Sequence, residues 1–117
     1  MPRVREVPMD GVVLKISPLS YDEAEVYIKE GRDMLSREPK PTDEEWAART
    51  LKSVVNALNK AAGKEEWSLN GDESKKKLTK ELDMVYINKL YQEWLEMSGL
   101  VPKAVPQGGA PATSTSA

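Results

Sequence analysis

The 117-residue chain contains no cysteine, no histidine and no phenylalanine. Without cysteine and histidine there is no disulfide, no thiolate nucleophile and no imidazole base, and the commonest zinc ligands are missing. No apolar run approaches the roughly 20 residues that a membrane-spanning helix needs. The first residues, Met1 to Glu6, also lack the apolar core of a signal peptide. These absences exclude several classes of catalytic, metal and membrane-embedded protein.

A strong charge of one sign is also lacking. Seventeen Lys and Arg residues stand against 19 Asp and Glu residues, which gives a formal net charge of −2. Such a balance does not favour non-specific binding to nucleic acid. A DNA-binding regulator is the least favoured interpretation, because the second expected helix begins with three acids and carries only Arg49, Lys52 and Lys60.

The remaining polar residues form no recognisable catalytic or cofactor motif. The seven glycines are scattered, and none opens a helix directly after a strand as a phosphate-binding loop requires. The run from Asn70 to Glu73 lacks the alternating acids of a calcium loop. We therefore expect no enzyme activity, no cofactor and no metal site.

Two capping boxes predict where the first two helices begin. Ser20 precedes Glu23, and Thr42 precedes Glu45, at the spacing that lets the hydroxyl and the carboxylate each accept a backbone N–H. The apolar spacing that follows predicts helices over 20–36 and 42–62, separated by the proline-containing linker 37–41. Gly31, inside the first helix, marks either close helix packing or a kink.

The most apolar and most periodic stretch runs from Leu78 to Leu100 and predicts a third helix near 79–98. Thr79 and Asp83 are both suitable N-caps, so the start of this helix is left open. Gly99 suits the left-handed conformation that ends a helix. The residues expected in the core are Leu51, Val54, Val55, Leu58, Leu82, Val85, Leu90 and Trp94.

Both ends of the chain differ from the helical middle. Residues 1–19 contain two β-prone runs around a glycine-containing turn, which predicts an extended segment or hairpin. From Pro102 to Ala117 small residues and proline dominate, and such a composition does not offset the entropy of ordering. The sequence therefore predicts a mainly α domain over 1–101, with three principal helices, a short extended or β N-terminal segment and a disordered low-complexity tail over 102–117.

The last helix carries more apolar surface than one neighbour requires. Its apolar residues are divided into two stripes: Val85, Tyr86, Leu90 and Trp94 in the first, and Ile87, Tyr91 and Leu95 in the second. We expect the second stripe to be exposed and to bind a partner, either a second copy or a client protein. The alternative is that the N-terminal strand and the Trp67 segment cover it within the chain. Ring, dimer and monomer are all left open.

The order of these parts carries a resemblance. A strand passes through Ile16-Ser17-Pro18-Leu19-Ser20-Tyr21 into an acidic helix, a second helix contains the run from Leu51 to Asn59, and a last helix ends in Met97-Ser98-Gly99-Leu100 before the low-complexity tail. In this order, over about residues 10–100, the chain resembles the small tail assembly chaperones of long-tailed bacteriophages.

The resemblance implies a non-enzymatic protein that binds and solubilises the tape measure protein and recruits tail tube subunits. Such a protein acts in the cytoplasm of the infected bacterial host and is absent from the mature virion. The resemblance also implies a longer form made by ribosomal frameshifting, for which the tail after Gly99 offers an attachment point. The alternative is a structural head–tail or tail-completion subunit that is retained in the virion.

The composition of the tail generates a prediction about folding. Truncation after Lys103 should leave the helical circular dichroism and the melting temperature nearly unchanged, because the removed residues have little apolar surface to bury. A drop of many degrees in the melting temperature would show instead that the tail docks on the helical domain.

Overall fold

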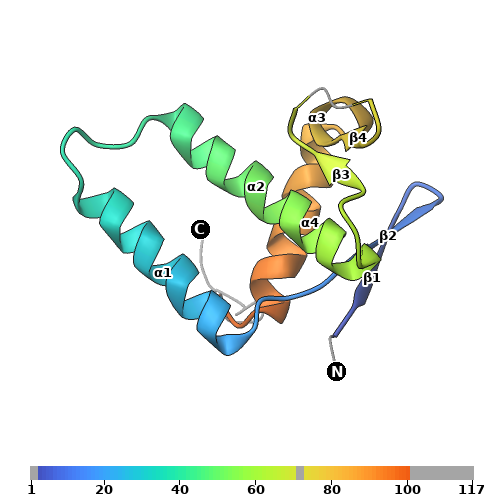
Figure 1. The fold of residues 1–117 in the computed structure, drawn as a ribbon, viewed down its shortest axis with the longest axis horizontal. Helices are drawn as coiled ribbons and strands as arrows, with labels where there is room; N and C mark the ends of the chain where they lie inside the picture. Colours follow the sequence, from blue (N-terminus) through green and yellow to red (C-terminus); the bar gives the residue numbers. More distant parts are fainter. Residues whose placement is uncertain (1–2, 71–72, 101–117) are drawn as a thin grey trace, which may run out of the picture.

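The computed structural model describes residues 3–70 and 73–100 of the chain. A hairpin of β1 (Arg5–Met9) and β2 (Val12–Ile16) is followed by α1 (Tyr21–Ser36) and α2 (Asp43–Ala62). The short strands β3 (Trp67–Ser68) and β4 (Lys76–Lys77) then lead to the one-turn helix α3 (Leu78–Glu81) and to α4 (Met84–Met97). The predicted mainly α fold with an N-terminal β segment is confirmed (Figure 1). The tail predicted over 102–117 lies outside the described residues.

The first two helices begin where their caps predict. Ser20 Oγ accepts the Glu23 N–H at 3.3 Å, and the Glu23 carboxylate accepts the Ser20 N–H at 2.8 Å, so this capping box is complete. Thr42 Oγ1 accepts the Glu45 N–H at 3.2 Å. The Glu45 carboxylate pairs with Arg37 at 2.5 Å, and the second cap therefore acts through Thr42.

The third predicted helix is divided in two. α3 is a separate turn, and α4 begins after Asp83, whose carboxylate accepts the Tyr86 N–H at 3.0 Å. Of the two N-caps left open by the sequence, Asp83 is therefore the one that starts the long helix. Gly99, with a φ of 75°, follows its end in the left-handed conformation.

The N-terminal hairpin packs on the helices rather than standing alone. Its two-residue turn has positive φ at both Asp10 (45°) and Gly11 (81°), as a tight β-hairpin requires. Val7, Met9 and Ile16 are buried on the face toward α2 and α4. This packing is necessary, because an isolated two-stranded hairpin is marginally stable in water.

α4 packs against both α2 and β1 and supplies the centre of the core, while β2 packs directly on α2 (Figure 1). Its Leu90 is 0% exposed and its Trp94 is 2% exposed. The core residues confirmed by burial are Val54, Val55, Leu58, Leu82, Leu90 and Trp94. Leu51 is partly buried against this cluster.

The prediction that Val85 belongs to the core is wrong, since its side chain is 71% exposed. Val85 lies nine residues before Trp94, and at 3.6 residues per turn that separation places the two side chains on opposite faces of the helix. The buried face of α4 consists of Ile87, Leu90, Trp94 and Met97.

α1 is attached to the rest of the molecule largely through Arg49 of α2. The Arg49 guanidinium donates to the Tyr27 carbonyl oxygen at 2.6 Å and lies 3.6 Å from the centre of the Tyr27 ring. A Cβ at Gly31 would lie 2.9 Å from the same guanidinium. Close packing at Gly31 is therefore confirmed, and α1 continues through it as one helix.

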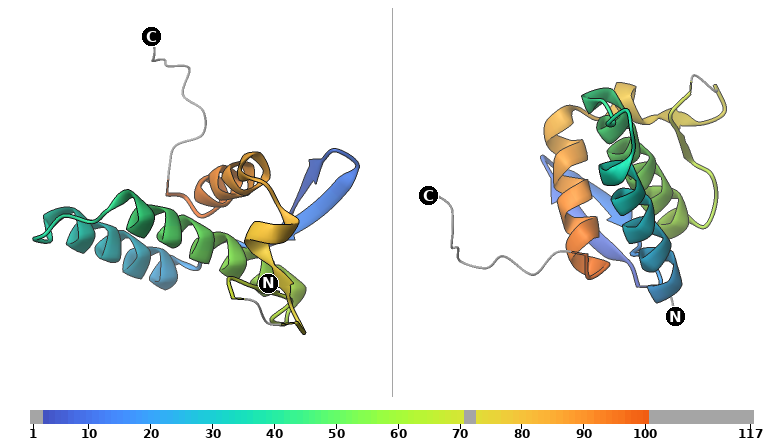
Figure 2. Two further views of the ribbon diagram at one scale, coloured as in Figure 1. Left: turned by 90° about the horizontal axis from the view of Figure 1, so that it is seen from above. Right: turned by 90° about the vertical axis from the view of Figure 1, so that its left-hand side faces the viewer.

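A second polar contact ties the start of α1 to the end of α2. Lys60 Nζ donates to the Glu23 carboxylate at 2.8 Å and to the Pro18 carbonyl oxygen at 2.9 Å. No residue of α1 itself is buried, and the helix lies along one side of α2 at the edge of the molecule (Figure 2). The contacts that place α1 are therefore mainly polar and aromatic.

The central position of Leu90 gives a stability prediction. Leu90→Ala should lower the free energy of unfolding by ~2–5 kcal/mol, because it removes fully buried methyl groups and leaves a cavity. Urea titration followed by circular dichroism measures this loss, with Lys89→Ala on the exposed side of the same turn as the control. A loss below about half a kcal/mol would place Leu90 outside the core.

The contact between Glu23 and Lys60 gives a pH prediction. The Lys60 ammonium, followed by the Ser20 N–H, lowers the pKa of Glu23 from 4.5 to about 2. Because the pKa is lower in the folded state, the stabilisation is present above about pH 4.5 and is lost as the pH falls toward 2. The free energy of unfolding of wild type should exceed that of Glu23→Gln by roughly 0.2–1 kcal/mol at pH 7. The difference, measured by urea titration, should vanish near pH 2; a constant difference would contradict the assignment.

Candidate functional site

An apolar groove lies between the first half of α2 and the region where α3 gives way to α4. Its volume is about 530 Å³. We call it the α2–α4 groove, and its lining residues are Ala47, Thr50, Leu51, Thr79, Leu82, Asp83, Met84, Ile87 and Asn88. This volume falls within the range of about 300–1,000 Å³ that is usual for ligand sites in proteins.

The break between α3 and α4 creates this groove. Leu82 and Ile87 are buried at 8% and 6% exposure and belong to the core cluster, while Met84 stays 77% exposed at the start of α4. The Asp83 cap fixes the direction in which α4 leaves the break. The groove therefore has an apolar lining from the core and a flexible, exposed methionine beside it.

The structure separates the three residues that the sequence grouped as a partner-binding stripe. Ile87 lines the α2–α4 groove. Tyr91 and Leu95 are partly buried against the core cluster and do not line the groove. The expectation of one exposed stripe is wrong, because Ile87 lies seven residues before Trp94 and so shares its buried face.

Tyr91 is held by α1 rather than by the hairpin or the Trp67 segment. Its hydroxyl lies 2.5 Å from the Tyr27 hydroxyl, and its ring stacks on Trp94 with the ring centres 5.8 Å apart. Tyr27 meets Trp94 edge-on at 5.1 Å. Burial, followed by the hydrogen bond to Tyr27, raises the pKa of Tyr91 to about 12. These contacts give Tyr91 a role in joining α1 to α4.

The groove residues that the sequence analysis missed come mainly from other elements. Ala47 and Thr50 of α2 and Thr79 of α3 carry no sequence signal for binding. Met84 did carry a sequence signal for binding, because it is an apolar residue directly after an N-cap, where the first helical turn is normally exposed.

A second exposed apolar surface lies on α1. Tyr21, Ile28 and Leu35 are 79%, 40% and 64% exposed. They recur at intervals of seven residues, which places them along one line of the helix surface. We call this line the α1 ridge. It lies apart from the α2–α4 groove, whose lining contains no residue of α1.

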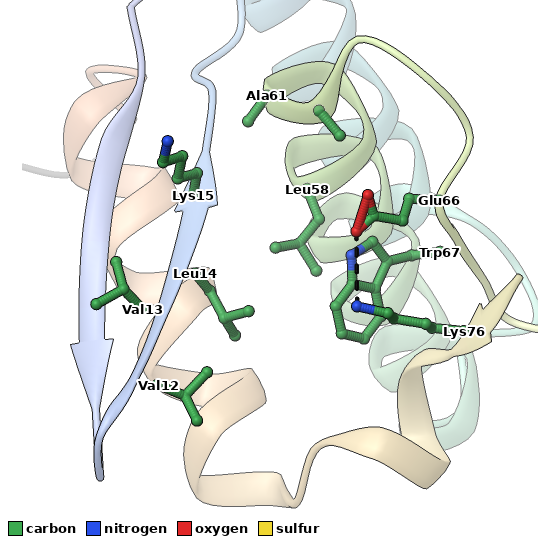
Figure 3. A pocket seen from close by; sticks show the side chains of 10 residues that line it. Val12, Val13, Leu14, Lys15, Leu58, Ala61, Glu66, Trp67 and Lys76 are labelled. Carbon is green, nitrogen blue, oxygen red and sulfur yellow. Dashed lines mark ion pairs between the residues drawn. The ribbon is translucent and has the colours of Figure 1, made fainter.

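A further cavity of about 470 Å³ lies between β2 and the end of α2 (Figure 3). Trp67 forms part of its wall, and Lys76 lies 5.2 Å from the centre of the Trp67 ring and 3.7 Å from the Glu66 carboxylate. Asn59 fixes this segment by accepting the Trp67 N–H at 2.8 Å and donating to the Trp67 carbonyl oxygen at 3.0 Å. We interpret these contacts as the means by which the loop is held on α2.

Neither a metal centre nor a membrane span is found in the part of the chain that the structure describes. Within residues 3–70 and 73–100 no group of three or more Asp and Glu side chains is arranged to hold a metal ion. No helix in these residues is long and apolar enough to cross a membrane. No protein-family model, curated protein or solved structure matches the chain.

Proposed function

We propose that the protein is a non-enzymatic tail assembly chaperone of a long-tailed bacteriophage, and that its α2–α4 groove binds a helical segment of the tape measure protein. In this function it keeps the tape measure protein soluble, recruits tail tube subunits and acts in the cytoplasm of the infected host. The main observation that supports this proposal is the apolar groove with exposed Met84 beside it.

The shape and lining of the groove support a helical client. Two helices, α2 and α4, form its long sides, and apolar side chains predominate between them. An amphipathic helix typically binds such a surface by inserting side chains spaced three, four and seven residues apart. The tape measure protein is expected from the resemblance to be long and helical, so it offers many segments of this kind.

Met84 supports a binding surface that accepts more than one sequence. A methionine side chain is unbranched and polarizable, and it adapts to differently shaped partners. Polar groups around the apolar lining, among them Thr50, Asp83 and Asn88, give orientation without requiring one client sequence. A chaperone that coats a long protein needs this tolerance.

The proposal predicts that Met84→Glu abolishes solubilisation of the tape measure protein. The change places a charge beside the apolar groove, while a glutamate in the first turn of α4 is favourable for the helix itself. Co-expression measures the result as the share of tape measure protein in the soluble fraction. Val26→Glu is the matched control, because Val26 is 58% exposed on α1 and does not line the groove.

Two outcomes would contradict this function. If Met84→Glu solubilises the tape measure protein as well as wild type does, the groove is not the client site. If purified mature particles contain the protein in stoichiometric amounts, the alternative of a head–tail or tail-completion subunit replaces the chaperone. Mass spectrometry of such particles makes this second measurement.

A further inference from the structure

The α1 ridge is apolar surface that the described part of the chain leaves uncovered. None of the 16 residues of α1 is buried, and Tyr21, Ile28 and Leu35 stay 79%, 40% and 64% exposed. α2 contacts a neighbouring flank of the helix, through Arg49 at Tyr27 and Gly31. The ridge therefore lies outside the contact with Arg49, and α4 reaches α1 at Tyr27 rather than at the ridge.

The arrangement of side chains along the ridge is nearly symmetric about its centre. Ile28 is its centre, with Tyr21 seven residues before it and Leu35 seven residues after it. Glu25 and Arg32 lie beside the ridge, each four residues after a ridge residue and thus on the same flank of the helix. If the direction of the helix is reversed about Ile28, Tyr21 and Leu35 exchange places, and Glu25 and Arg32 approximately exchange places.

Glu25 and Arg32 are both available for a partner. Each is exposed, and neither side chain forms an ion pair within the described residues. The neighbouring charges of α1 are engaged differently, since Lys29 pairs with Asp33 at 3.1 Å and Glu23 pairs with Lys60 at 2.8 Å. The flank of the ridge thus presents one free acid and one free base, seven residues apart.

From this symmetry we propose that the α1 ridge binds the α1 ridge of a second copy, with the two helices antiparallel about a twofold axis at Ile28. In an antiparallel pair related by a twofold axis, the same flank of both helices lies on the same side of the contact. Ile28 then meets its own counterpart, Tyr21 meets Leu35 of the second copy, and Glu25 meets Arg32 twice.

The charges favour a second copy over an unrelated helix. A client helix needs a complementary pattern of its own, whereas a second copy supplies this pattern automatically, because the acid and the base exchange places on reversal. Every contact away from the axis is made twice, so one favourable pair contributes double to the association. This dimer does not depend on the proposed function, since the α2–α4 groove shares no residue with the ridge.

The test is sedimentation equilibrium of the full chain over a range of concentrations. Wild type should show a monomer–dimer equilibrium, and Ile28→Glu should remove the dimer, since it places two like charges together on the twofold axis. Val26→Glu, an exposed β-branched residue of the same helix away from the ridge, should leave the dimer unchanged. Because no residue of α1 is buried, both variants should keep the wild-type circular dichroism.

Charge reversal tests the direction of the pair. Glu25→Arg and Arg32→Glu should each weaken self-association roughly tenfold, because both ion pairs become repulsive. An equimolar mixture of the two variants should form a heterodimer at wild-type strength, and the double variant E25R/R32E should dimerise again. A parallel arrangement would place each of these residues level with its own counterpart, so a single charge reversal would only exchange one like-charge contact for another and would not weaken association.

Three outcomes would overturn the dimer. The first is a wild-type protein that stays monomeric at every concentration measured, and the second is an Ile28→Glu variant that associates as wild type does. The third is a mixture of the two charge variants that fails to associate. Met84→Glu, which disables the groove, should dimerise normally, so failure of the client site and failure of the ridge are distinguishable.

Discussion

The burial of one face of α4 is the interaction on which the rest of the structure depends. Leu90 and Trp94 are almost fully buried. α2 and β1, which both contact α4, pack around this face. The hairpin packs on α4 through β1, where Arg5 pairs with Glu93 at 2.7 Å, and on α2 through β2, and this packing stabilises it. With no phenylalanine in the chain, tryptophan, leucine and valine provide most of the buried volume.

Local signals in the sequence predicted the local structure well. The capping residues Ser20, Thr42 and Asp83 each accept the expected backbone N–H, because a cap acts over three residues and needs no tertiary information. The sequence predicted less well which residues of α4 face the core. Ile87 belongs with Leu90 on the buried face and Val85 does not, a distinction that depends on strict helical angles rather than on apolar content.

The candidate site was harder to predict because it depends on which helices are neighbours. Tyr91 and Leu95 look like an uncovered stripe when the last helix is considered alone. In the fold, Tyr27 of α1 covers Tyr91, and no property of residues 84–97 specifies that contact. α1 also carries exposed apolar residues, Tyr21, Ile28 and Leu35, whose seven-residue spacing was visible in the sequence but whose exposure was not.

The way α1 is attached explains how one small domain can carry two independent surfaces. The body is held by apolar burial around α4, whereas α1 is held by Arg49 on Tyr27 and by Lys60 on Glu23. Substitutions on the exposed side of α1 therefore have little effect on the core, which leaves that side free to acquire a pattern suited to a partner. The groove is different: Leu82 and Ile87 serve both the core and its lining. Its exposed edge, which includes Met84 and Asn88, can change with less effect on the fold, so any specificity of the groove is expected to reside there.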